Sequence, residues 1–139
     1  MRKKILFLAG MMACCTWAGA QEISKTWVAD KGNGTYQNPV LHADYSDPDV
    51  CAAGDDFYMT ASSFNCIPGI PILHSNDLVN WSLVNYALPV QEPEAFFDKA
   101  QHGKGVWAPA IRFHNGEFYI YWGDPDYGCL LYTSPSPRD

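Results

Sequence analysis

The sequence has few basic side chains and no long apolar run beyond its first twenty residues. Nine Lys and Arg stand against fifteen Asp and Glu, a formal net charge of −6. Within residues 21–128 the imbalance is larger, with five basic against fourteen acidic side chains. A surface this acidic repels phosphates and anionic lipid, so nucleic acid and membrane partners are disfavoured and a neutral substrate is favoured.

Cysteine is also scarce, because only Cys51 and Cys66 lie within residues 21–128. Two cysteines do not make a disulfide framework, although an exported chain could form one bridge. They fall on opposite sides of the midpoint of a predicted hairpin. We therefore expect two buried free thiols, with their redox state left open. The four histidines show no paired metal-ligand spacing, so neither a metal site nor another cofactor is predicted in this segment.

The first twenty residues have the features of a secretory signal peptide. Arg2, Lys3 and Lys4 form a basic start, residues 5–17 are apolar, and residues 18–20 are small. The alternative is an N-terminal membrane anchor, but the apolar run is short for spanning a bilayer. We expect cleavage before Gln21, a secreted or periplasmic protein, and no membrane association after cleavage.

The last eleven residues, 129–139, resemble the in-frame translation of a transposon-type sequencing adapter. Segments of that origin are excluded from fold reasoning. The natural sequence is then predicted to cover residues 21–128, about one small domain's worth of chain, with the parent gene continuing beyond it.

The pattern between these ends is that of β-strands. Gly54-Asp55-Asp56 and Asn115-Gly116 are hairpin turns between apolar alternations. No helical periodicity of useful length occurs, so the fold class is predicted to be all-β. The expected strands cover residues 48–53, 57–63, 67–74, 82–88, 110–113 and 117–122.

Residues 48–59 and 109–120 repeat one pattern 61 positions apart: proline, strand, tight turn and aromatic strand. A supersecondary unit repeated at this period suggests radially arranged β-modules, as in a propeller. Asp47 precedes the first strand of one copy, and Asp124 follows the second strand of the other. Both lie at the same end of their hairpins and can face one axial pocket. Paired carboxylates can do general acid–base chemistry, although a single Asp beside a proline more often caps a turn.

Several motifs in order resemble glycoside hydrolase family 43, especially its β-xylosidase-like branch. They are Asn38-Pro-Val-Leu, Asp47-Pro-Asp-Val, Gly54-Asp-Asp-Phe-Tyr-Met-Thr, Ser63-Phe64, His74-Ser-Asn-Asp-Leu-Val-Asn-Trp81 and Gly105-Val-Trp-Ala-Pro109. The resemblance implies a five-bladed β-propeller, of which the first blade and part of the second are present. It also implies hydrolysis of xylose- or arabinose-containing glycans with inversion. The sequence does not distinguish xylose from arabinose.

The resemblance also implies roles for individual residues. Asp47 would be the general base, and Asp124 would tune the pKa of the general acid and orient it. Phe64 and Trp107 would line the sugar subsite. Asp49 departs from the family pattern, in which an uncharged residue often follows Asp-Pro, and its role stays open.

The general acid of the family is a Glu from a later blade. Glu92, Glu94 and Glu117 do not stand in a matching context, so we expect this chain to lack the acid and to be inactive alone. Some relatives hold a structural cation through later blades, which would apply only to a full-length propeller.

Two other functions stay open. One is a propeller that binds plant-type polysaccharides or oligosaccharides without cleaving them. The other is a sucrose- or fructan-cleaving propeller, which would use a nucleophilic Asp and retain the anomeric configuration.

Overall fold

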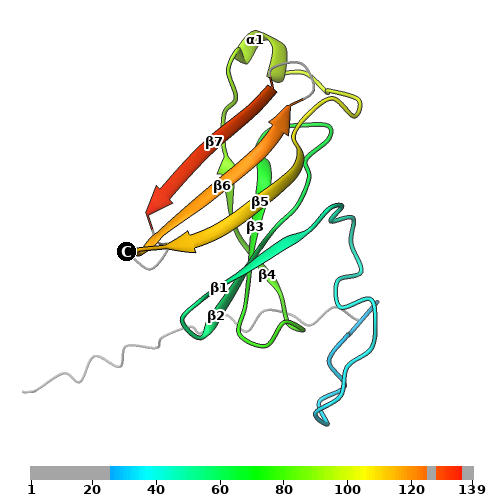
Figure 1. Ribbon diagram of the computed structural model, residues 1–139. Coiled ribbons are helices and arrows are strands. Elements are labelled where there is room, and N and C mark those ends of the chain that lie inside the picture. Colours follow the sequence, from blue (N-terminus) through cyan, green and yellow to red (C-terminus); the bar gives the residue numbers. More distant parts are fainter. Residues whose placement is uncertain (1–25, 125–127, 136–139) are drawn as a thin grey trace, which may run out of the picture.

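The computed structural model describes residues 26–124 and 128–135 of the chain. Within these residues seven strands form two antiparallel sheets, joined by a connection that contains one short helix (Figure 1). The four-stranded sheet has the order β1-β2-β3-β4, and the three-stranded sheet has the order β5-β6-β7. The elements are β1 Asp49–Ala53, β2 Asp56–Thr60, β3 Gly69–Ser75, β4 Ser82–Leu88, α1 Glu94–Phe97, β5 Trp107–His114, β6 Glu117–Asp124 and β7 Gly128–Pro135.

Both predicted hairpins are present. Ala53 pairs with Asp56 across the first turn, where Gly54 adopts a φ of 65°. The second turn has positive φ at both Asn115 and Gly116 (52° and 84°), the backbone that tight hairpins with right-handed twist require. The 61-residue repeat thus corresponds to the first two strands of each sheet, and the predicted all-β class is confirmed.

The turn between β3 and β4 is built from side chains that bind their own backbone. Ser75 Oγ accepts from the Leu78 amide at 2.9 Å, and Asp77 Oδ1 accepts from the amides of Val79 and Asn80. The indole of Trp81 closes the turn by donating to the Leu78 carbonyl at 3.0 Å. Hydrogen bonds to its carboxylate, above all those from Asn80, lower the pKa of Asp77 to about 2.

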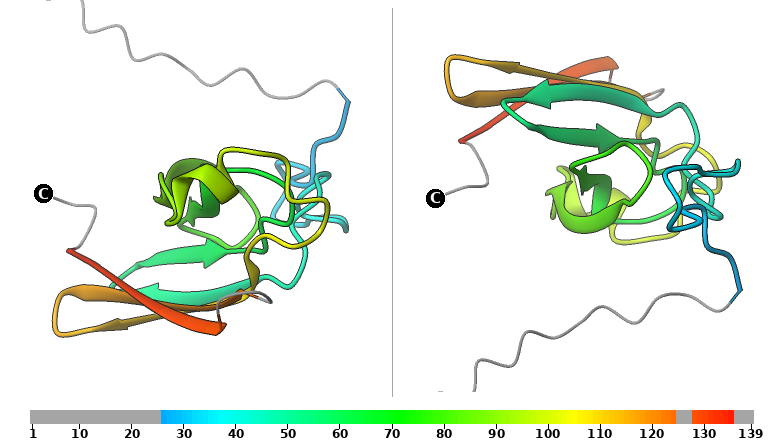
Figure 2. Two further views of the ribbon diagram at one scale, coloured as in Figure 1. Left: turned by 90° about the horizontal axis from the view of Figure 1, so that it is seen from above. Right: turned by 90° about the horizontal axis from the view of Figure 1, so that it is seen from below.

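The two sheets pack against each other, with β1 alongside β5 in all three views (Figures 1 and 2). Their shared core contains Tyr58 and Ile70 from the first sheet and Ile111, Phe118 and Trp122 from the second. The Tyr58 and Phe118 rings meet edge to face at 4.7 Å between centroids. The first sheet is one complete predicted blade, and the second is the start of the next.

Some expectations about the remaining segments need correction. Helix α1 was not predicted, because four residues are too few to produce a periodic pattern. Its Phe97 is buried, and Gln101 Nε2 donates to the carbonyls of Phe96 and Lys99 at 2.6 and 2.8 Å. Cys66 is exposed and Cys51 half-buried, so the two free thiols are not both buried as expected.

The two ends leave other expectations untested. The predicted signal peptide, residues 1–20, lies outside the described residues. Residues 129–139 were expected to lie outside the fold, yet Gly128–Pro135 forms strand β7 beside β6. Backbone pairing does not bear on the origin of this sequence, so the adapter origin stays a prediction. No helix in the described ranges is long and apolar enough to cross a membrane.

Candidate active site

Asp47 stands immediately before β1 in a strained backbone conformation with its side chain exposed. Its φ is 49°, a left-handed value that non-glycine residues rarely adopt. Ser46 Oγ and Ser62 Oγ donate hydrogen bonds to Asp47 Oδ2 at 3.0 and 2.9 Å. Both hydroxyls bind the same oxygen, which leaves Oδ1 without a donor from the described part of the chain. The carboxylate is therefore held in one orientation with one oxygen free to bind another group.

The serine pair that follows β2 connects this carboxylate to the second sheet. Ser62 Oγ accepts from the amide of Ala108 at 2.9 Å. Ser63 exchanges two backbone hydrogen bonds with Val106, at 2.9 and 3.0 Å. The segment leading into β5 is thus fixed beside the segment that carries the serines.

Gly105 allows this close approach of two backbones. A Cβ at this position would lie 2.3 Å from the Ser63 carbonyl oxygen and 3.0 Å from the Phe64 carbonyl carbon. The same Phe64 carbonyl accepts from the amides of Gly103 and Gly105 at 3.1 and 3.0 Å. The glycine is needed here for space, and the sequence motif Gly105-Val-Trp-Ala-Pro109 contains it for that reason.

Phe64 and Trp107 are brought to this region by those contacts. Trp107 begins β5, is 47% exposed, and donates from its indole to the Gly103 carbonyl at 2.8 Å. Phe64 lines a pocket of about 250 Å³ together with Ser46 and Ser62, the two residues that bind Asp47. Trp107 is not part of the lining of this pocket. The assignment of both aromatic residues to a sugar subsite stays a prediction.

Tyr45 also lines the Phe64 pocket. Burial, followed by the neighbouring Tyr86, raises the pKa of Tyr45. Its phenol therefore stays protonated at neutral pH and can donate a hydrogen bond to a neutral polar ligand.

Asp124 ends β6 at the predicted end of the hairpin. Gly123, its neighbour, pairs with Trp107 at the start of β5. The side chain of Asp124 lies outside what the structure describes, as does Asp126. The backbone thus brings the end of β6 next to the Trp107-Ala108 segment that Ser62 binds. That the carboxylates of Asp47 and Asp124 face one pocket stays a prediction.

Asp49 has a position that the sequence left open. Its Oδ2 accepts from the amide of Ile111 at 2.7 Å and from the guanidinium of Arg112 at 2.5 Å. Both partners belong to β5, which is an edge strand of its sheet among the residues that the structure describes. Asp49 therefore links the two sheets through an amide at that edge.

Glu117 begins β6 and accepts a hydrogen bond from the Tyr119 hydroxyl at 2.9 Å. It is one of the three glutamates that do not match the family's general acid in sequence. Asp124 ends the same strand of eight residues, so the two residues are about 23 Å apart along it. Glu117 thus lies at the opposite end of the hairpin from the candidate site.

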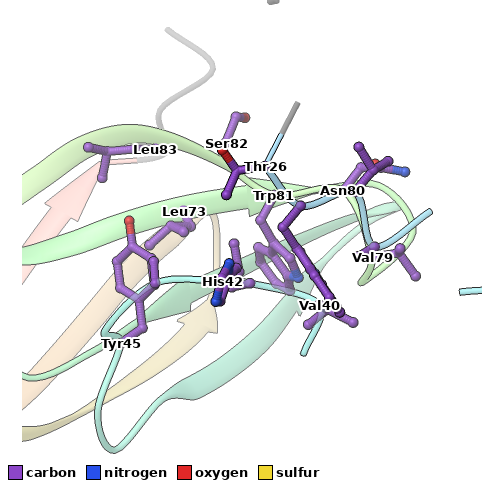
Figure 3. A pocket seen from close by; sticks show the side chains of 15 residues that line it. Thr26, Val40, His42, Tyr45, Leu73, Val79, Asn80, Trp81, Ser82 and Leu83 are labelled. Carbon is purple, nitrogen blue, oxygen red and sulfur yellow. The ribbon is translucent and has the colours of Figure 1, made fainter. Parts of the chain in front are cut away.

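A second pocket, of about 510 Å³, lies away from Asp47 between the segment of residues 26–45 and strands β3 and β4 (Figure 3). The rings of Trp27 and His42 pack at 5.4 Å between centroids. Trp81, which lies beside His42 in Figure 3, also lines the pocket. Trp27 Nε1 is bonded to the Pro39 carbonyl at 2.7 Å. These two contacts hold the N-terminal segment together, and Asn80 Nδ2 in the turn before β4 donates to Asp30 Oδ2 at 3.0 Å, which links the segment to the first sheet.

The described residues contain no group of three or more His, Cys, Asp or Glu side chains that could hold a metal ion. Burial, aided by Asp49, raises the pKa of the Cys51 thiol to about 11 despite the opposing effect of Arg112, so this thiol stays protonated. Cys51 is thus not suited to act as a nucleophile at neutral pH.

The comparisons with known proteins agree on one family. The family model described as glycosyl hydrolases family 43 matches residues 36–138. The chain is 36% identical over 107 residues to the non-reducing end α-L-arabinofuranosidase BoGH43B of Bacteroides ovatus, covering 74% of this chain and 20% of that protein. It is 38% identical over 122 residues to a β-xylosidase of Formosa agariphila, covering 83% of this chain and 20% of that protein.

Among solved structures, a bifunctional GH43-CE protein of Bacteroides eggerthii superposes with a TM-score of 0.65 at 35% identity. The match covers 74% of this chain and 15% of that one. The structural relatives are family 43 enzymes with five-bladed β-propellers, which confirms the predicted propeller class. The chain spans about a fifth of the length of the curated relatives named above.

Proposed function

The chain belongs to glycosyl hydrolase family 43, and from this membership we propose that it is the N-terminal part of an enzyme that hydrolyses O-glycosidic bonds in xylan- or arabinan-type glycans. The two relatives named above are an α-L-arabinofuranosidase and a β-xylosidase, which supports this substrate class. The complete protein would act as a β-xylosidase, an α-L-arabinofuranosidase, or both.

The observation that carries the proposal is the setting of Asp47. An exposed carboxylate has one oxygen bonded to two serine hydroxyls and the other available, next to a pocket that contains Phe64. This arrangement suits a general base, whose free oxygen takes the proton of an attacking water. Because the first sheet supplies Asp47 and the second begins with Trp107, a sugar between them would contact both.

We propose inversion as the stereochemical course. In an inverting glycosidase one carboxylate activates water while a carboxylic acid on the other face protonates the leaving oxygen. The two groups stand about 6.5–9.5 Å apart to leave room for the water. Asp47 takes the first role, and Asp124 raises the pKa of the acid and orients it. The acid itself comes from a part of the enzyme beyond this chain, so the 139-residue chain has no turnover of its own.

The location and partners follow the same proposal. The basic and apolar start of the chain supports export, and the acidic composition supports an uncharged plant-type glycan as substrate.

A non-catalytic glycan-binding propeller is the second candidate. The exposed Trp107 and the Phe64 pocket support it equally, because both can bind a sugar without a reaction. The hydroxyl-bonded carboxylate of Asp47 favours the enzyme, since sugar binding alone does not need that orientation.

The test uses the complete gene product with nitrophenyl β-xyloside and nitrophenyl α-L-arabinofuranoside. We expect turnover of at least one substrate, with the inverted anomer formed first in an NMR time course. Asp47→Asn keeps the shape of the side chain but removes the base, and we expect kcat to fall by about 10²–10⁴-fold.

Wild-type turnover in Asp47→Asn would contradict the base assignment. Sugar binding by the parent without any turnover would favour the second candidate. First formation of the retained anomer would instead indicate a nucleophilic Asp.

A further inference from the structure

Three residues in strained backbone conformations lie around the serine pair, Ser62 and Ser63, that follows β2. Asp47, Ile70 and Ala108 have φ angles of 49°, 57° and 37°, although none is glycine. Ile70 donates its amide to Ser63 Oγ at 2.8 Å, and Ser62 Oγ bonds both other residues. Each such conformation is unfavourable for a residue with a side chain and persists only when its surroundings hold it. The hydroxyls of Ser62 and Ser63 each bond to one or more of these three residues.

The direction of each bond at Ser62 is fixed by chemistry. The Ala108 amide can only donate, so Ser62 Oγ accepts there. A hydroxyl has one proton, and the carboxylate oxygen of Asp47 can only accept, so that proton points to Oδ2. Ser62 therefore joins the candidate base in the first sheet to the start of β5 in the second.

We propose that Ser62 is the positioning residue of the catalytic base, and that it sets the distance between the Asp47 carboxylate and the sugar bound near Trp107. This inference rests on the proposed function, because it takes Asp47 as the base. One hydroxyl orients the carboxylate and the same hydroxyl fixes the residue after Trp107. A water activated by Asp47 is thereby aligned with a sugar that the second sheet holds.

Ser46 does not have the same role, although it donates to the same oxygen. It is the immediate neighbour of Asp47, and its hydroxyl forms no hydrogen bond to β5 among the described residues. Loss of Ser46 Oγ removes one of two bonds that orient Asp47. Loss of Ser62 Oγ also leaves the Ala108 amide without its acceptor, so the carboxylate and the subsite can move apart.

The test compares Ser62→Ala, Ser62→Thr and Ser62→Cys in the complete gene product. Alanine removes the hydroxyl, threonine keeps it, and cysteine keeps the approximate size but offers only a weak donor. Ser82→Ala in β4 is the matched control, because its hydroxyl makes a long 3.5 Å contact with the His74 carbonyl and β4 is the edge strand of the first sheet opposite β1.

We expect Ser62→Ala to lower kcat by about 10–100-fold, the loss that a misplacement of about 1 Å produces, with little change in KM. Ser62→Thr should recover most of this loss, Ser62→Cys should resemble alanine, and Ser82→Ala should match the parent. If Ser62→Ala does not fold, the difference in kcat between Ser62→Cys and Ser62→Thr tests the positioning role instead.

Parental kcat in Ser62→Ala or Ser62→Cys would overturn the inference, as would an equal loss in Ser62→Thr. Asp47→Asn is measured in parallel to separate the two proposals. If Asp47→Asn is inactive while Ser62→Ala has parental kcat, only the positioning role fails. If Asp47→Asn is fully active, the base assignment fails as well.

Discussion

The link from Asp49 to β5 gives a graded prediction of stability. Asp49 accepts from two donors of different kinds, the Ile111 amide and the Arg112 guanidinium. Ile111 is 1% exposed, so its amide depends on Asp49 as its acceptor in place of water. An unsatisfied buried donor costs about 1–3 kcal/mol. The Arg112 side chain is 62% exposed, and exposed ion pairs contribute about 0–1 kcal/mol.

From these values we expect Asp49→Ala to lower the free energy of unfolding by about 2–3 kcal/mol. Asp49→Asn keeps a carbonyl oxygen that can accept from the amide, and should cost about 1 kcal/mol. Arg112→Gln should cost about 0.5 kcal/mol. The variants are compared by urea unfolding of the complete gene product, and the exchange rate of the Ile111 amide is measured by hydrogen–deuterium exchange.

The reasoning fails if Arg112→Gln costs as much as Asp49→Ala, because the ion pair would then dominate. It also fails if the Ile111 amide stays equally protected in Asp49→Ala. Activity of the folded Asp49→Asn variant separates this link from a charge effect on the nearby base. We expect its kcat to stay near that of the parent.

Two further predictions concern the loop at Gly105 and the turn at Asp77. Gly105→Ala brings a Cβ to 2.3 Å from the Ser63 carbonyl oxygen, and the overpacking should cost about 1–3 kcal/mol or more in urea unfolding. Gly116→Ala is the control, because a Cβ there meets nothing within 4 Å although the φ is 84°. It should lower the free energy of unfolding by about 1–2 kcal/mol. A smaller loss of stability in Gly105→Ala than in Gly116→Ala would refute the steric argument. The lowered pKa of Asp77, about 2 against an ordinary 3.8, means that its stabilisation is present above pH 4 and is lost as the pH falls through 2. The stability difference between the parent and Asp77→Asn should therefore shrink between pH 4 and pH 2, and a constant difference would show that the carboxylate charge is not involved.

The parts of the fold that were predictable from sequence depend on local signals. The Asn115-Gly116 turn and the Ser75–Trp81 turn use backbone angles and side-chain bonds that neighbouring residues determine. Strand β4 was predicted with its observed bounds for the same reason, since turn residues bracket it. Helix α1 gave no signal because it is a single turn that the loop around Gln101 holds in place.

The site was predictable only in part. Asp47 was found from its position before a repeated strand, and that position depends on hairpin geometry alone. Ser62 was missed as its partner, because its bonds join residues 15 and 46 positions away. Asp49 stayed open for the same reason, since its partners are 62 and 63 positions away. A signal was present in the Ser62-Ser63 pair, whose two small hydroxyl side chains follow a strand directly before an aromatic residue.

The bond between Ser62 and Ala108 also has a consequence for the order of events during protein synthesis. Ser62 leaves the peptidyl transferase centre 46 residues before the amide that orients it exists. At about 5–20 residues per second, this delay is roughly 2–9 s. During that interval Asp47 and Ser62 lack the partner in β5 that fixes them. A nascent chain on a ribosome paused between these two codons would therefore have an Asp47 carboxylate that is not yet held in its final position.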